Sequence, residues 1–241
     1  MKNIFFALIF SSFFINIAWA ENDLSRYIDE CKSFINPPKV ELFSSYGKLR
    51  YKFDKDEDFL RKETAKKFSE QNITMPDDLL PLGLTKVQDL FDFNFTASTM
   101  GLSHGYTCVY PETISARLEY SLPTIYILNS LKEGNCVYNL ALRHEKTHMQ
   151  IYIEALDYFL PILKDYMSHL FDELGFVVVA RGDSVDKAAK ELNEKYLKKM
   201  QEKIEVWHNE LEAEELKLDT ADHYLLENLI CEYLEGQNPI N

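Results

Sequence analysis

The chain has one long hydrophobic run, at residues 4–18, and no second run long enough to cross a bilayer. A membrane-spanning helix needs about 20 mostly apolar residues, so we expect none in the rest of the chain. Basic residues are also scarce, since 26 Lys and Arg stand against 39 Asp and Glu, for a formal net charge of −13. Nucleic acids and anionic membrane surfaces are therefore disfavoured as partners, because they carry the same sign of charge.

The single hydrophobic run has the layout of a secretory signal peptide over residues 1–20. Lys2 is the charged start, and Ala18-Trp19-Ala20 is a small-x-small cleavage site after the apolar middle. We expect cleavage after Ala20, which predicts a mature protein in the periplasm or outside the cell, without stable membrane insertion. The alternative is an uncleaved membrane anchor, which the cleavage site disfavours. No cysteine follows closely enough to indicate lipid attachment.

Cysteines are few and widely spaced, at Cys31, Cys108, Cys136 and Cys231. They form no C-x-x-C pair, which argues against a zinc ribbon or a thioredoxin-type redox motif. In an exported chain an even number of cysteines indicates disulfides, here two with three possible pairings. We favour a bridge from Cys108 to Cys136. The second bridge, from Cys31 to Cys231, would then tie the two ends of the chain together.

The mature chain has two halves of different pattern. Residues 21–130 are rich in turn residues and in short period-two alternation, which is typical of strands with one buried face. Helical periodicity in this half is confined to residues 24–35 and 58–70. The expected strands cover residues 49–53, 91–96, 114–120 and 124–128.

Residues 135–235 show apolar side chains at helical spacing instead. A long helix begins near Val137, and we expect Pro161 to kink or end its regular part, although the apolar pattern resumes through Leu163, Met167 and Leu170 before Gly175. A turn at residues 175–182 leads to a second long helix, capped at Asp183-Ser184, and residues 219–234 form a closing helix. The whole predicts one α+β domain over residues 21–241. In it a small, mostly antiparallel sheet packs against the first long helix, and the second runs antiparallel to the first.

The first long helix contains the run His144-Glu145-Lys146-Thr147-His148. Four helical residues rotate by about 400°, so the two imidazoles project from nearly one face and can reach one metal ion. Glu145 lies about 100° away, where its carboxylate can take a proton from water and pass it to a leaving amine. This H-E-x-x-H pattern is typical of zinc peptidases.

Context supports a functional interpretation of the motif over a coincidence. A chance match is expected on the order of once in a hundred chains of this length. Here both histidines lie on the apolar stripe of a strongly helical segment, where polar groups are costly to bury unless they have a partner. A bound metal ion would explain them, and preceding strands could hold an extended substrate by main-chain hydrogen bonds.

A catalytic zinc ion needs a third protein ligand. Glu154 has the spacing of that ligand in metzincins, but on an unbroken helix it lies about 80° from the His144 direction, and Ile151 stands where that pattern needs glycine. If the two long helices pack antiparallel, the histidines are level with the end of the second helix and the residues just beyond it. The candidates there are His208, Glu214, Glu215, Asp219, Asp222 and His223.

The sequence resembles the predicted secreted zinc-dependent proteases of bacteria that were catalogued as a domain of unknown function. The resemblance covers roughly residues 91–224. It includes Gly-Tyr-Thr-Cys at residues 105–108, the strand at 124–128, the helix with Leu-Arg-His-Glu-x-x-His at 142–148, and a second long helix that ends in an Asp- and His-containing segment. In this segment the resemblance implies His223, after Asp219, as the third ligand.

These features predict an exported zinc metallopeptidase that hydrolyses peptide bonds in a peptide or protein substrate. Zinc on His144, His148 and His223 would polarise a water molecule, and Glu145 would act as the general base. Two alternatives come from other classes of protein. One is a catalytically silent, zinc-stabilised periplasmic binding module with the charged helices as its interaction surface, and the other is a helical adaptor without metal.

Overall fold

The computed structural model describes residues 24–70 and 80–220 and, beyond these, residues 223, 226, 229–231 and 233. The signal peptide predicted at residues 1–20 lies outside the described residues. The closing helix predicted at residues 219–234 is described in part, and its described residues from 223 to 233 are helical.

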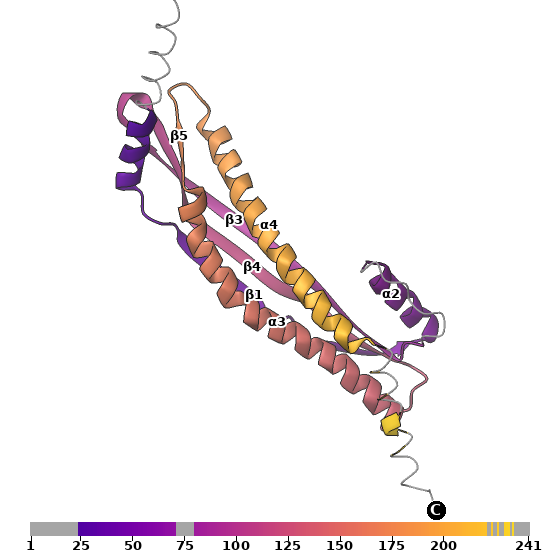
Figure 1. Ribbon diagram of the computed structural model, residues 1–241. Helices are drawn as coiled ribbons and strands as arrows, with labels where there is room; N and C mark the ends of the chain where they lie inside the picture. Colours follow the sequence, from indigo (N-terminus) through magenta and orange to yellow (C-terminus); the bar gives the residue numbers. More distant parts are fainter. Residues whose placement is uncertain are drawn as a thin grey trace, which may run out of the picture. The chain divides into compact units, whose positions relative to one another are not determined.

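The architecture is α+β with a five-stranded, mostly antiparallel sheet and two long helices, which confirms the predicted class (Figure 1). A helix over residues 24–34 comes first. The elements that follow are β1 (Lys39–Ser45), β2 (Arg50–Lys55), α2 (Glu57–Glu70), β3 (Gly83–Gly101), a 3-10 turn (Ser103–Gly105), β4 (Thr107–Leu128), α3 (Cys136–Leu174), β5 (Val177–Val179) and α4 (Val185–Leu218).

Strand β4 is the centre of the sheet, because every other strand pairs with it. Strand β2 is parallel to it, with Arg50 opposite Thr124, and β5 is antiparallel, with Val179 opposite Thr107. The sequence predicted two strands where β4 is continuous. The reason lies at Leu122, where φ is 50° and the buried face changes from the even-numbered positions of 114–120 to Ile125 and Ile127.

The described chain forms two compact units, and the long strands and helices each contribute residues to both. The first unit contains residues 24–41, 93–115 and 165–200. Its core is built on Tyr27, whose ring stacks on Tyr106 at 3.9 Å between centroids, and on a Cys31–Cys108 disulfide. Phe95 of β3 packs on Tyr196 of α4 in the same unit.

The second unit contains residues 42–70, 80–92 and 116–164 and the described residues from 201 on. Tyr120 of β4 is fully buried under the helices: its hydroxyl donates to the main-chain oxygen of Tyr152 in α3, and its ring stacks on Trp207 of α4. Trp207 also stacks on Phe159 of α3, at 5.1 Å between centroids. Helices α3 and α4 therefore pack on each other and on one face of the sheet.

Both predicted disulfides are present, but the favoured pairing is wrong. The bridges are Cys31–Cys108 and Cys136–Cys231. Cys31 belongs to the helix at 24–34, which packs on the start of β4. Cys136 is the first residue of α3, and Cys231 lies beside it. Disulfides of this kind form and persist in an oxidising environment, which agrees with an extracellular or periplasmic location.

Two predictions for the helical half have different outcomes. Helix α3 passes through Pro161 and continues to Leu174, in agreement with the apolar pattern that resumes through Leu163, Met167 and Leu170, all buried. The predicted turn after α3 contains strand β5 (Val177–Val179), which is defined by pairing with distant residues of β4. Such a non-local contact leaves no clear local pattern in three residues.

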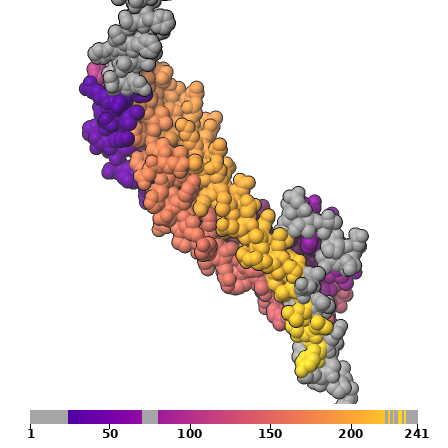
Figure 2. Space-filling model, in the orientation of Figure 1, coloured from indigo at the N-terminus to yellow at the C-terminus, as the bar shows by residue number. Residues whose placement is uncertain are grey.

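Helices α3 and α4 lie at the surface in Figure 2, and most of their exposed residues are charged or polar. Two ion pairs one helical turn apart, Lys187 with Glu191 and Lys190 with Glu194, lie near the start of α4. Within the described residues, no helix combines the length and the apolar character needed to cross a membrane.

Candidate metal centre

Helix α3 brings the two motif histidines together on its buried face. It is capped by Asn135, whose side-chain oxygen accepts a hydrogen bond from the backbone N–H of Tyr138. Two turns further on, His144 is 4% exposed and His148 is 2% exposed. Their Nε2 atoms lie 3.2 Å apart, so the four-residue spacing produces the convergence that the motif predicts.

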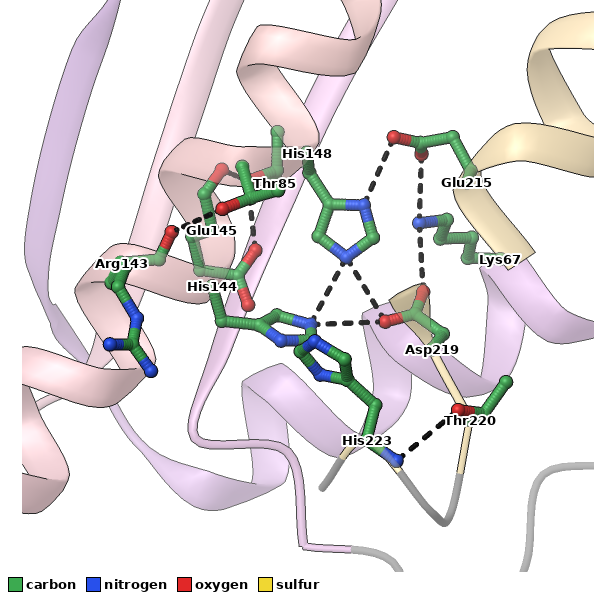
Figure 3. Close-up of polar contacts among 11 residues, drawn as sticks. Lys67, Thr85, Arg143, His144, Glu145, His148, Glu215, Asp219, Thr220 and His223 are labelled. Carbon is green, nitrogen blue, oxygen red and sulfur yellow. Dashed lines mark hydrogen bonds and ion pairs between the residues drawn. The ribbon is translucent and has the colours of Figure 1, made fainter. Parts of the chain in front are cut away.

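Asp219 completes a group of three possible metal ligands (Figure 3). It is the first residue after α4, which ends at Leu218. Its Oδ1 atom lies 3.2 Å from Nε2 of His144 and 3.0 Å from Nε2 of His148. The antiparallel helices thus place the end of α4 level with the histidines, which is where the sequence predicts the third ligand.

The dimensions of this group fit one small metal ion. Tetrahedral zinc binds nitrogen and oxygen at about 2.0–2.2 Å, which puts neighbouring donor atoms about 3.3 Å apart. The three observed separations, 3.0, 3.2 and 3.2 Å, are close to that edge length. The buried group of His144, His148 and Asp219 could therefore hold a metal ion with two imidazoles and one carboxylate.

Glu215 and Lys67 form a second layer around these three residues. Oε1 of Glu215 lies 3.0 Å from Nδ1 of His148, and because a carboxylate only accepts, Nδ1 must carry the proton. A metal ion in place of the Nε2 proton would then find the lone pair of Nε2 directed at the centre. Nζ of Lys67, from α2, lies 3.2 Å from Oε2 of Glu215 and 3.4 Å from Oδ2 of Asp219.

The electrostatics of the cluster favour positive charge at its centre. Burial acts to raise the pKa of Asp219, but hydrogen bonds from His144 and His148 outweigh it and hold that pKa well below its ordinary range. Burial acts to lower the pKa of His148, but its bonds to Asp219 and Glu215 outweigh this and raise the pKa to about 9. Ionised carboxylates in a buried place need compensating positive charge. Lys67 and the protonated imidazole of His148 supply it here, and a metal ion on the imidazoles would supply it in place of the imidazole proton.

Glu145 lies beside the two histidines on α3 and is 5% exposed. Its carboxylate oxygen Oε2 accepts a hydrogen bond from the hydroxyl of Thr85 in β3 at 2.8 Å. Burial raises the pKa of Glu145, against the lowering effect of His148 and His144. A carboxylate in such a place can accept a proton and release it again.

His223, the third ligand implied by the family resemblance, lies next to the cluster, with its ring centroid 5.6 Å from that of His144. It is not one of the three residues whose donor atoms converge, and its role as a ligand stays a prediction.

The other candidates for the third ligand have different surroundings. Glu215 binds His148 from the outer side. Glu214 is exposed and pairs with Lys217, and His208 pairs with Asp89. Glu154 is exposed and accepts a hydrogen bond from Gln150. Asp222 lies outside the described residues.

A cavity of about 270 Å³ adjoins the centre within the second unit. Lys67, Thr85 and Glu215, which contact the cluster, form part of its wall, and Val87, Tyr152 and Leu211 contribute apolar surface. The cavity reaches the cluster through these three wall residues, and its size is suited to a substrate side chain.

Lys67 and Thr85 were not predicted from the sequence. Lys67 is one of many charged residues on a polar helix, and Thr85 lies 60 positions before the glutamate it contacts, so neither carries a local signal.

Comparison of the chain with protein-family models, with curated proteins and with solved structures found no match. The resemblance to secreted zinc-dependent proteases therefore stays a prediction, and the site is interpreted on its geometry.

Proposed function

We propose that the protein is a zinc-dependent peptidase, with zinc held by His144, His148 and Asp219 and with Glu145 as the general base. The observation that carries the proposal is the convergence of three donor atoms within 3.2 Å of one another, two from α3 and one from the residue after α4, beside a buried carboxylate on α3. The proposed third ligand is the carboxylate of Asp219 in place of His223.

The donor set favours zinc over other common cations. Calcium and magnesium prefer sites made of oxygen ligands, whereas two of the three donors here are imidazole nitrogens. Imidazole suits zinc, copper, iron and nickel. Zinc has no redox chemistry, and a hydrolytic site needs none.

The proposed reaction is hydrolysis of a peptide bond. Bound zinc would supply Lewis acidity, which polarises a water molecule and the substrate carbonyl. Glu145 accepts the proton of the attacking water, and the water oxygen forms a bond to the acyl carbon. Glu145 then delivers the same proton to the nitrogen as the C–N bond breaks, so the carboxylate ends as it began.

The surrounding residues hold the ligands in place. Glu215 fixes the tautomer of His148 and the orientation of its ring. Lys67 binds Oδ2 of Asp219, the oxygen turned away from the imidazoles, and so directs Oδ1 to the centre. It also balances part of the negative charge of the two carboxylates.

A second candidate function is a silent binding module in which zinc is structural. Burial favours it, because His144, Glu145 and His148 are all at most 5% exposed. The number of ligands argues against it: structural zinc sites usually fill all four positions with protein, and three donors converge among the described residues. A peptidase needs the fourth position for water and substrate.

Metal analysis and peptide cleavage distinguish these functions. We expect one zinc per mature chain, cleavage of a mixed peptide library by the wild type, and no cleavage by Glu145→Gln, which should keep its zinc. Glu154→Gln, an exposed change on the same helix, is the matched control and should cleave normally. A wild type without zinc contradicts both metal-dependent functions, whereas zinc without Glu145-dependent cleavage favours the binding module.

A further inference from the structure

The start of strand β3 lies directly against the proposed general base. Thr85 is 4% exposed, and its hydroxyl lies 2.8 Å from Oε2 of Glu145 and 2.8 Å from the main-chain oxygen of the same residue. Figure 3 shows Thr85 beside the carboxylate of Glu145. One side chain of β3 therefore contacts both ends of the glutamate.

This contact restricts a side chain that the helix alone leaves mobile. Helix α3 fixes the Cα of Glu145, but three side-chain torsions separate its Cα from the carboxylate oxygens. A hydrogen bond from Thr85 to Oε2 selects one arrangement of these torsions. The bond engages Oε2 and not Oε1.

Gly83, two residues before Thr85, restricts the same carboxylate by its lack of a side chain. A Cβ atom built on Gly83 would lie 2.6 Å from Cγ, 2.7 Å from Oε1 and 2.9 Å from Cδ of Glu145. These distances are shorter than van der Waals contacts allow, so any other residue here must displace the carboxylate. The glycine is required by space and not by an unusual φ angle.

We propose that Gly83 and Thr85 are positioning residues for the catalytic carboxylate. Thr85 holds Oε2 by a hydrogen bond, and Gly83 leaves the room that the rest of the carboxylate occupies. This inference rests on the proposed peptidase function. Both residues contact Glu145, which is not one of the proposed metal ligands, so their variants separate the placement of the base from metal binding.

The first test removes the hydroxyl and then restores it. Thr85→Val keeps the shape of the side chain, and we expect kcat to fall about 10- to 100-fold, in line with the cost of misplacing a catalytic group. Zinc affinity should change less than about twofold, because the change leaves the metal ligands in place. KM should also change less than about twofold, because Thr85 is part of the cavity wall and valine keeps the shape of that wall. Thr85→Ser restores the hydroxyl and should return kcat to within about threefold of the wild type.

The second test adds one methyl group beside the carboxylate. Gly83→Ala should lower kcat toward the level of Glu145→Gln while zinc stays bound. Gly101→Ala is the matched control at the other end of β3, where a Cβ atom would meet nothing within 4 Å. It should leave both kcat and zinc affinity unchanged.

The position of the carboxylate can be followed without any peptidase activity. In protein labelled with 13C at glutamate Cδ, the signal of Glu145 is assigned by its loss in Glu145→Gln. We expect this signal to move in Thr85→Val and Gly83→Ala and to stay in place in Thr85→Ser and Gly101→Ala. An unmoved signal in Thr85→Val and Gly83→Ala overturns the positioning role, whatever the outcome of the cleavage assay. Normal kcat in Thr85→Val, or a Thr85→Ser variant as slow as Thr85→Val, overturns it equally.

Discussion

Glu215 accepts a hydrogen bond from Nδ1 of His148 at 3.0 Å, and it is 2% exposed. Its other oxygen binds Lys67 at 3.2 Å. These bonds hold the pKa of Glu215 below its ordinary value, although burial alone would raise it. The carboxylate is therefore ionised and orients the imidazole from behind.

The contact between Glu215 and His148 predicts a loss of metal affinity in Glu215→Gln. The amide can still accept from Nδ1, but it lacks the charge that makes the imidazole more basic and that balances Lys67. Partners of this kind cost roughly 10- to 100-fold in metal affinity when they are changed. The dissociation constant for zinc can be measured by competition with a chromophoric chelator.

Glu214→Gln is the matched control for this prediction, since Glu214 is the neighbouring residue on α4, is exposed and pairs with Lys217. It should bind zinc as the wild type does. Equal affinity of the wild type and Glu215→Gln would show that the Glu215 contact does not support the metal site.

The choice between Asp219 and His223 as the third ligand can be tested by the zinc affinity of their variants. If Asp219 binds the metal, Asp219→Ala loses more affinity than the roughly 100-fold that outer partners cost. His223→Gln then leaves zinc affinity within about threefold, because it changes a neighbour and not a ligand. The same chelator competition measures both variants. A larger loss of zinc affinity in His223→Gln than in Asp219→Ala would identify His223 as the third ligand instead.

Local spacing in the sequence predicted the part of the candidate metal site that lies on one helix. His144, Glu145 and His148 lie on one helix, so helical geometry relates them directly. The antiparallel packing of two long helices narrowed the third ligand to a short stretch that includes Asp219. The choice within it depends on where the chain turns after Leu218, and helical periodicity does not specify that turn.

Contacts between distant residues explain what was not predicted from the sequence. The pairing of Cys31 with Cys108 depends on a helix packing against β4 across 77 residues. Strand β5 exists through its pairing with the start of β4, and the bond from Thr85 to Glu145 joins a strand to a helix. In each case the partner is defined by the tertiary fold, whereas long strands and helices repeat their pattern often enough to be recognised.

The two disulfides predict different effects on zinc binding. Cys136–Cys231 closes the part of the chain that contains both histidines, Glu215 and Asp219, whereas Cys31–Cys108 lies in the other compact unit. Removing either bridge by paired Cys→Ser changes should cost about 2–5 kcal/mol of stability. Only loss of Cys136–Cys231 should also weaken zinc binding, because it releases the segment that follows Asp219.

Thermal unfolding and chelator competition on the two double variants check this prediction. The variant without Cys31–Cys108 is the control, since it loses stability without a change at the site. Equal zinc affinity in both variants would show that the second bridge stabilises the chain without supporting the metal centre.

Zinc itself should stabilise the folded protein, because the unfolded chain does not hold the three donors together. At a free zinc concentration 100 times the dissociation constant, the gain is about 2.7 kcal/mol, so the unfolding midpoint should rise as zinc is added and fall when a chelator removes it. Asp219→Ala should lose this response, and Glu154→Gln should keep it. Magnesium is the matched cation, and it should have little effect on a site with two imidazole donors. An equal shift of the unfolding midpoint with magnesium would mean that the carboxylates attract any divalent ion. The two imidazole donors would then no longer indicate zinc.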